Sequence, residues 1–244
     1  MSEPTTLEGY IAVSAALSAG SRPVHAVYLR DDKRDADALK IARLAAAAGV
    51  AVERISAEQI AERAGGDTHG GILALAGERQ FVPLDDLIST RETPFIVMLD
   101  GVEDPFNFGQ AVRAFYAAGA HGLVVRPRNW MSAASVVARA SAGASERIPT
   151  AIVETAEDAA AHFRAAGLRI AVADSQRATP IYDADLTQPL FMLVGGEKRG
   201  VTRSFADKAD MRLKIPYGRI FEYDLGTTAA AAALAFEVLR QRRK

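Results

Sequence analysis

The residue best suited to act on an anionic ligand is Arg113, because a guanidinium stays protonated at ordinary pH and donates several hydrogen bonds. It falls within a predicted helix that begins near Asn107, off the apolar stripe of that helix. Helical side chains lean toward the N-terminus, so this guanidinium can reach back over the turn before the helix. That turn follows a predicted buried strand, and open α/β sheets bind ligands at the carboxyl ends of their strands.

A second candidate site is the glycine-rich stretch that follows the apolar run Phe191–Val194. Gly195, Gly196 and Gly200 leave little side-chain bulk there, so backbone N–H and C=O groups can hydrogen-bond a nucleoside-like ligand. Lys198 falls between these glycines and no GK[ST] follows, which excludes a P-loop. Taken alone, the stretch is weak evidence for a backbone-lined site.

A third stretch joins a strand end to a helix through an irregular loop. Ile215 and Pro216 end the predicted strand, and an alanine-rich helix follows over Thr227–Arg242. The small residues Ala229–Ala233 allow a neighbouring backbone to approach closely, either in ordinary core packing or at a subunit interface.

These stretches require a framework of alternating strands and helices. Phe95–Leu99, a helix ended by Gly119, and Gly122–Val125 form one strand–helix–strand unit, the building block of a parallel sheet. The later predicted elements are helices over Ala133–Ala142 and Ala156–Ala166, and strands over Ile148–Val153, Leu168–Ala173, Pro189–Val194 and Met211–Ile215. We therefore predict an α/β domain over residues 94–244, with a mostly parallel sheet covered by helices on both faces.

The N-terminal part is predicted to be a smaller α/β domain over residues 1–78, arranged in three layers. Its predicted elements are helices over Leu7–Leu17, Asp35–Ala48 and Ala57–Ala64, and strands over Val24–Leu29, Val50–Ile55 and Ile72–Ala76. A polar linker over residues 79–93, carrying one helical turn, joins it to the second domain.

Composition excludes several classes of protein. Apolar residues make up 49% and charged residues 24% of the 244, as in ordinary globular proteins. No apolar run approaches the roughly 20 residues of a membrane span, and no signal peptide is visible. The net charge of −1 argues against a non-specific basic coat for nucleic acid. There is no cysteine, and no histidine pair has metal-ligand spacing, so we expect a cytoplasmic protein without a metal.

Three motifs resemble those of the SpoU family of RNA ribose 2′-O-methyltransferases, within the knotted SPOUT class. The first comprises Asp104-Pro105, Asn107, Gly109, Arg113 and Gly119-Ala120; the second is Phe191–Val201; the third is Ile215–Leu239. Their order and spacing match the family across the C-terminal half. More weakly, the N-terminal part resembles the ribosomal-protein-like RNA-binding domain that many members carry.

The resemblance implies S-adenosylmethionine as cofactor, RNA as substrate, a deep trefoil knot and a homodimer whose active site is completed across the interface. It implies catalytic roles for Arg113, Asn107 and Glu197, and cofactor contacts for Leu193, Gly195, Gly196, Gly200, Ile215, Pro216, Leu225 and Thr228. Asn107 could equally be a plain helix N-cap, and Glu197 a surface carboxylate. The two-domain layout favours ribosomal RNA over transfer RNA as substrate.

The third motif departs from the family pattern at three positions. Tyr217 replaces a methionine, Asp224 a serine, and Gly226 the asparagine typical of the family. These departures leave an alternative open, an RNA-binding protein of the same fold that has lost or reduced catalysis. A nucleotide-binding oxidoreductase is excluded, since GxGxxG and an acidic ribose partner are both missing.

Overall fold

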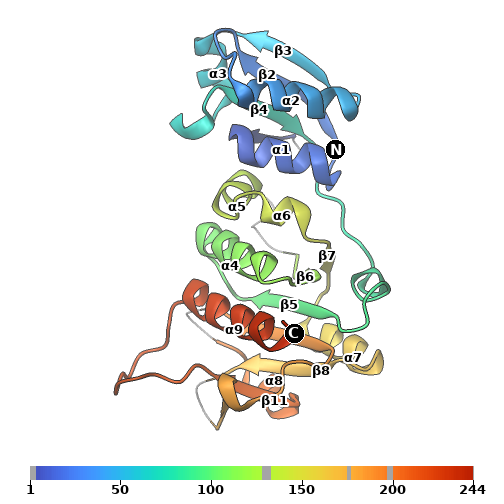
Figure 1. Cartoon of the computed structure of the whole chain (residues 1–244), viewed down its shortest axis with the longest axis vertical. Helices are drawn as coiled ribbons and strands as arrows, with labels where there is room; N and C mark the ends of the chain where they lie inside the picture. The colour runs from blue at the N-terminus through green and yellow to red at the C-terminus, as the bar shows by residue number, and fades with distance from the viewer. Residues whose placement is uncertain (1–3, 128–132, 175–176, 197–199, 244) are drawn as a thin grey trace. The chain divides into compact units, whose positions relative to one another are not determined.

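The computed structural model describes residues 4–127, 133–174, 177–196 and 200–243, which form two compact units. Unit 1 holds the described residues within Met1–Gln80 and Ser132–Arg147, and unit 2 those within Phe81–Met131 and Ile148–Lys244. Figure 1 colours the chain by residue number, so that the yellow-green helices of unit 1 can be told from its blue N-terminal part.

Unit 1 is a mixed four-stranded sheet with helices on both faces. Its elements are β1 (Thr5–Glu8), α1 (Gly9–Ala19), β2 (Val24–Arg30), α2 (Ala36–Ala47), β3 (Ala51–Ile55), α3 (Ala57–Arg63), the 3₁₀ turn η1 (Asp67–His69), β4 (Ile72–Ala76), α5 (Ala134–Ala140) and α6 (Ala144–Arg147). The strand order is β1-β4-β2-β3, with β4 antiparallel to both its neighbours and β2 parallel to β3. Helices α1 and α2 bury one face of the sheet, and α3 packs on the other, which confirms the predicted three layers.

The start of unit 1 differs from the prediction. A helix was expected from Leu7, but Thr5–Glu8 is a strand and α1 begins at Gly9. The Glu8 side chain is buried, and both of its carboxylate oxygens have partners. One accepts the Gly65 N–H at 2.8 Å and the other lies 3.3 Å from the Arg139 guanidinium. A buried carboxylate with partners distant in sequence leaves no apolar signal in the local pattern.

A buried charge cluster ties α6 to the N-terminal part of unit 1. The Glu146 carboxylate accepts hydrogen bonds from the Arg22 guanidinium at 2.8 and 3.0 Å and from the Ser21 hydroxyl at 2.5 Å. The Arg79 guanidinium lies 3.6 Å from the same carboxylate. Burial lowers the pKa of Arg79 to about 10, against the opposing influence of Glu146. Buried charges must be paired, so this cluster fixes α6 in place.

Unit 2 contains a sheet of seven strands whose neighbouring pairs are all parallel. Its elements are η2 (Leu84–Leu87), β5 (Phe95–Asp100), α4 (Pro105–Ala117), β6 (Gly122–Val125), β7 (Thr150–Ile152), α7 (Ala156–Ala165), β8 (Arg169–Ala173), β9 (Thr179–Pro180), η4 (Ile181–Asp183), β10 (Leu190–Gly195), α8 (Arg203–Lys208), β11 (Met211–Lys214) and α9 (Thr227–Arg242). The strand order is β7-β6-β5-β10-β8-β11-β9.

The central strands are buried on both faces. Ile96 and Met98 of β5 pack into a cluster that α7, α8 and η2 cover. The alternate residues Phe95, Val97 and Leu99 are also buried, on the face where α4 and α9 pack against each other (Figure 1). This arrangement confirms the predicted α/β class with a parallel sheet between two layers of helices. No helix of the described residues is long and apolar enough to cross a bilayer.

Candidate functional site

The site lies at the carboxyl ends of the central strands of unit 2. Asp100 at the end of β5 is in register with Gly195 at the end of β10, and β8 lies on the other side of β10. Parallel neighbours end at the same edge of a sheet, so the segments that follow these strands converge there.

Two glycines at this edge occupy positions that have no room for a side chain. The Gly196 N–H donates to the Asp100 carbonyl and the Gly200 N–H donates to the Gly196 carbonyl, each at 2.8 Å. A Cβ added to Gly195 would lie 2.4 Å from the Gly200 carbonyl carbon, and one added to Gly196 would lie 2.0 Å from the Gly101 oxygen. We refer to Gly195, Gly196 and Gly200 as the glycine turn. Because close approach excludes side chains there, backbone atoms form this part of the site.

A cavity of about 890 Å³ opens between the glycine turn, the end of β11 and the start of α9. Most of the residues predicted to bind the cofactor line it, namely Gly195, Gly196, Gly200, Ile215, Pro216 and Leu225. Leu193 does not line it, because it is buried among the side chains beneath α7. The sequence therefore located the two backbone segments that meet at the cavity.

Helix α9 lines the cavity with residues other than the one predicted. Thr227, Ala230 and Leu234 form the helix side of the cavity, at the spacing of one helical face. Thr228 points elsewhere, and its hydroxyl donates to the Asn107 carbonyl of α4 at 3.4 Å. Helical spacing of small residues was the signal that could have identified this face.

Helix α4 is capped by Asp104, so the prediction of Asn107 as N-cap is wrong. An Asp104 carboxylate oxygen accepts the Asn107 N–H at 2.8 Å, and Pro105 occupies the first helical position. Proline is favoured there because its fixed φ suits the first turn and it has no N–H to satisfy. Asn107 thus lies inside the first turn, half-buried, where its carbonyl meets α9.

Arg113 is exposed on α4, away from the buried residues Phe108, Val112 and Phe115. Among the described residues it forms no hydrogen bond or ion pair, and it does not line the cavity. Glu197, the third predicted catalytic residue, lies outside the described residues, as do Lys198 and Arg199.

A charged pair that the sequence did not reveal lies at the same edge of the sheet. The Asp100 carboxylate accepts hydrogen bonds from two nitrogens of the Arg126 guanidinium, the Nε at 2.7 Å, and both side chains are partly buried. Asp100 ends β5 and Arg126 follows β6, its parallel neighbour. The convergence of parallel strand ends was the signal that could have predicted this pair.

The site has the character of a pocket for an organic ligand. Within the described residues, no group of three His, Asp or Glu side chains could hold a metal ion. The cavity is lined by the glycine turn, by apolar side chains and by four charged residues, the carboxylates Asp174, Glu222 and Asp224 and the ammonium of Lys214, so that negative charge exceeds positive. Such a lining suits a nucleoside-like molecule that carries a positive charge.

Comparison with protein families identifies two matching regions. Residues 94–225 match the model described as "SpoU rRNA Methylase family". Residues 6–82 match the model described as "RNA 2′-O ribose methyltransferase substrate binding".

Curated relatives match along almost the whole chain. The 23S rRNA (guanosine-2′-O-)-methyltransferase RlmB of Shewanella oneidensis is 28% identical over all of both chains. Its namesake in Ralstonia nicotianae is 29% identical over 99% of this chain and 98% of its own.

Solved structures of two methyltransferases share the fold. The AdoMet-bound rRNA methyltransferase from Sinorhizobium meliloti superposes with a TM-score of 0.80 at 26% identity, covering 98% of this chain and 87% of its own. The SpoU methyltransferase AviRb from Streptomyces viridochromogenes has a TM-score of 0.81 at 23% identity, covering 98% of this chain and 90% of its own; at that identity it supports the fold alone. The matched motifs, the converging glycine turn and the two family regions together establish that this chain belongs to the SpoU rRNA methylase family.

Proposed function

We propose that this protein transfers the methyl group of S-adenosylmethionine to a ribose 2′-hydroxyl of RNA, with ribosomal RNA favoured over transfer RNA, in the cytoplasm. The observation that carries the proposal is the meeting of the glycine turn and the segment after β11 at one cavity. The relatives named as 23S rRNA guanosine 2′-O-methyltransferases, matched over both units, support the choice of ribosomal RNA.

The residues around the cavity fit S-adenosylmethionine. A volume of about 890 Å³ lies within the range of about 300–1,000 Å³ that holds ligands of this size. The glycine turn would hold the nucleoside through backbone groups, with Ile215 and Leu225 as apolar contacts. Glu222 and Asp224 would face its positive charge. When bound, the cofactor supplies an electrophilic methyl group on a sulfonium.

The chain itself has to position the hydroxyl and stabilise the charge that develops as its proton leaves. Arg113 suits this role because it is exposed and its guanidinium is always protonated, so it can hold an RNA phosphate and a developing alkoxide. A protonated arginine is a poor base, so the proton passes to the phosphate or to water. Asn107, whose carbonyl bonds to α9, keeps the first turn of α4 in place for Arg113.

We further propose a homodimer in which each cavity is completed by the other copy. Arg113 and Asn107 do not line the cavity of their own chain, which supports a contribution from a second copy. The helices α4 and α9 pack together and carry exposed aromatic side chains, Phe106 and Tyr116 on α4 and Phe236 on α9, which offer an apolar surface for the second copy.

We also infer the trefoil knot of the family. The close approach of Gly196 to Gly101 supports tight passage of the chain there.

A second function, RNA binding without catalysis, is favoured by one observation. Gly226 is the N-cap of α9 and has no side chain with which to cap it, where the family carries asparagine. The two functions separate in one experiment, calorimetry with S-adenosylmethionine followed by tritiated methyl transfer to protein-free ribosomal RNA. Transfer at a 2′-oxygen, mapped by mass spectrometry, supports methylation. Binding of cofactor and RNA without transfer supports the second function.

A further inference from the structure

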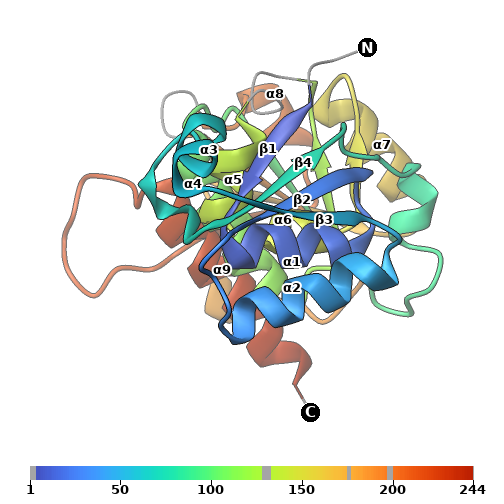
Figure 2. The same cartoon turned by 90° about the horizontal axis from the view of Figure 1, so that it is seen from above.

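The segment between β11 and α9 extends away from the sheet of unit 2, as both cartoon views show (Figures 1 and 2). We refer to residues 217–226 as the arm. Large apolar side chains along it are exposed: Tyr217 is 40%, Phe221 57%, Tyr223 72% and Ile220 100% exposed. An exposed group of this size in a folded chain calls for a binding partner, since exposure of contiguous apolar surface is unfavourable.

Three of these side chains form an ordered cluster. The Phe221 ring centroid lies 6.0 Å from that of Tyr217 and 5.6 Å from that of Tyr223, with interplanar angles of 62° and 64°. These are favourable edge-to-face contacts. The Tyr217 hydroxyl accepts the Leu225 N–H at 3.1 Å, which ties the two ends of the arm together. We refer to Tyr217, Phe221 and Tyr223 as the aromatic cluster.

The aromatic cluster faces the candidate site, and the most exposed residue of the arm does not. Tyr217, Phe221 and Tyr223 all line the 890 Å³ cavity, whereas Ile220 is absent from its lining. A protein partner seated on the arm would be expected to cover Ile220 first. A ligand that enters the cavity mouth would instead meet the three rings.

The charges of the arm indicate which part of an RNA the rings would contact. Arg219 is its one cation, against the carboxylates of Glu222 and Asp224. A net negative charge does not attract the phosphate backbone. Aromatic rings, in contrast, stack on unpaired bases of any sequence, and RNA recognition relies on such splayed bases.

We propose that the aromatic cluster is a stacking platform that holds an unpaired nucleobase of the RNA substrate at the mouth of the cofactor cavity. The proposal rests on the proposed function and specifies its substrate: RNA presented with a nucleotide displaced from the helical stack. Phe221 and Tyr223 supply the exposed ring faces, and Tyr217 anchors the platform through Leu225.

Truncating both exposed rings tests the platform directly. The double variant Phe221→Ala/Tyr223→Ala is expected to raise the KM for protein-free ribosomal RNA by about 5- to 150-fold per stacked base lost. Its affinity for S-adenosylmethionine by calorimetry should stay within about twofold of the parent chain, because none of the cofactor contacts proposed above comes from the Phe221 or Tyr223 ring. Tyr223→Phe keeps the ring and should behave as the parent, and Ile220→Ala is the matched control on the same arm.

Binding of a single-stranded oligoribonucleotide carrying 2-aminopurine gives a second readout, independent of methyl transfer. Stacking on the cluster should quench its fluorescence with the parent chain and with Ile220→Ala, but not with the double variant. Unchanged KM and unchanged quenching in the double variant would overturn the platform. If Ile220→Ala raises the KM and reduces quenching as much as the double variant does, and also changes the oligomeric state, the arm is a protein contact instead. If the parent chain quenches 2-aminopurine but methylates no RNA, the catalytic proposal fails and the platform stands.

Discussion

The two sides of the cavity are built in opposite ways. The glycine turn is backbone packed so closely that a single Cβ on Gly196 would lie 2.0 Å from a neighbouring carbonyl oxygen. The arm across from it consists of exposed side chains held by ring contacts and one hydrogen bond. One side is rigid because the core of the sheet lies directly behind it. The other lacks such support, as expected for a wall of the cavity that contacts the RNA in the function proposed above.

The same substitution on the two sides should have very different effects. Gly196→Ala forces the backbone apart, so we expect a loss of about 1–3 kcal/mol in the free energy of unfolding and loss of measurable cofactor binding. Gly218→Ala on the arm is the matched control, because a Cβ there has open space around it. Thermal unfolding and calorimetry with S-adenosylmethionine measure both effects. Cofactor affinity like that of the parent chain in Gly196→Ala would remove the basis for calling this side rigid.

Arg113 should affect transfer while leaving both sides of the cavity intact. Arg113→Ala removes the donor proposed to stabilise the developing alkoxide, so the rate of transfer is expected to fall by about 10²–10³-fold. Cofactor affinity should be unchanged, because Arg113 is exposed and does not line the cavity. Arg113→Lys should recover only part of the rate, since lysine lacks the planar fork. Single-turnover methyl transfer is the measurement. A variant that keeps most of its turnover would exclude the assigned role.

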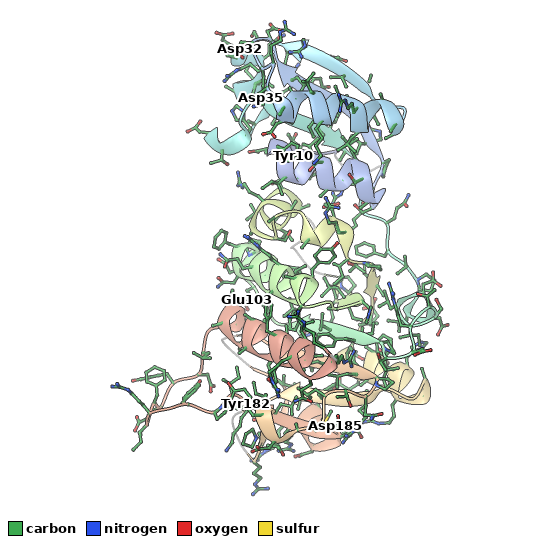
Figure 3. The ribbon with its side chains drawn as sticks, viewed as in Figure 1. Tyr10, Asp32, Asp35, Glu103, Tyr182 and Asp185 are labelled. Atoms are coloured by element: carbon green, nitrogen blue, oxygen red, sulfur yellow. The ribbon has the colours of Figure 1, made fainter. Side chains whose placement is uncertain are left out.

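Removing the hydroxyl of Tyr217, which anchors the arm, should have a smaller effect on stability and on RNA binding. Tyr217→Phe removes the acceptor for the Leu225 N–H at a partly exposed site, so the expected loss is at most about 1 kcal/mol. The Leu225 amide should then exchange its hydrogen faster, and the KM for RNA should rise a few-fold. Tyr182→Phe is the control: Tyr182 is also exposed but belongs to η4 rather than to the arm (Figure 3). Slow exchange at Leu225 in both variants would contradict the anchoring.

The strand β5 ends beside the glycine turn, and its stability should respond to acid at its other end, where Phe95 begins the strand. The imidazole Nδ1 of His121 accepts the Phe95 N–H at 2.9 Å, and burial, with Arg91 and Arg242 nearby, lowers the pKa of His121. As the pH falls, His121 is therefore protonated in the unfolded chain before it is protonated in the folded chain. Its contribution to the free energy of unfolding is full above about pH 6.5 and declines below that pH. Between pH 7.5 and pH 5.5, the free energy of unfolding measured with denaturant should fall more for the parent chain than for His121→Asn. Asparagine keeps an acceptor but does not titrate. Equal losses would remove His121 from this role.

A structural feature could be predicted from the sequence where residues close together in the chain determine it. Glycines, prolines and apolar runs encode backbone geometry, so β5, β10, the glycine turn and the Ile215-Pro216 segment were all predictable. The cap of α4 was misassigned to Asn107 although Asp104-Pro105 is itself a local signal.

Features that depend on distant partners were not predictable. The strand at Thr5–Glu8 depends on its pairing with β4, and the burial of Glu8 on Arg139 and Gly65. The short helix α6 depends on Arg22, which pairs with Glu146. At the site, the Asp100–Arg126 pair and the outward course of the arm are likewise tertiary features. The direction of a side chain such as Thr228, which bonds to α4, is set by packing between helices.

The placement of α5 and α6 limits how this chain can be divided. Because residues 134–147 fold with unit 1 although they lie between β6 and β7 in sequence, the polypeptide passes from one unit to the other three times. A deletion of the first 80 residues would therefore leave Ala138 without its packing partners and Glu146 without Arg22 and Arg79. Protease cleavage at a single peptide bond would therefore leave the two units joined through the remaining crossings.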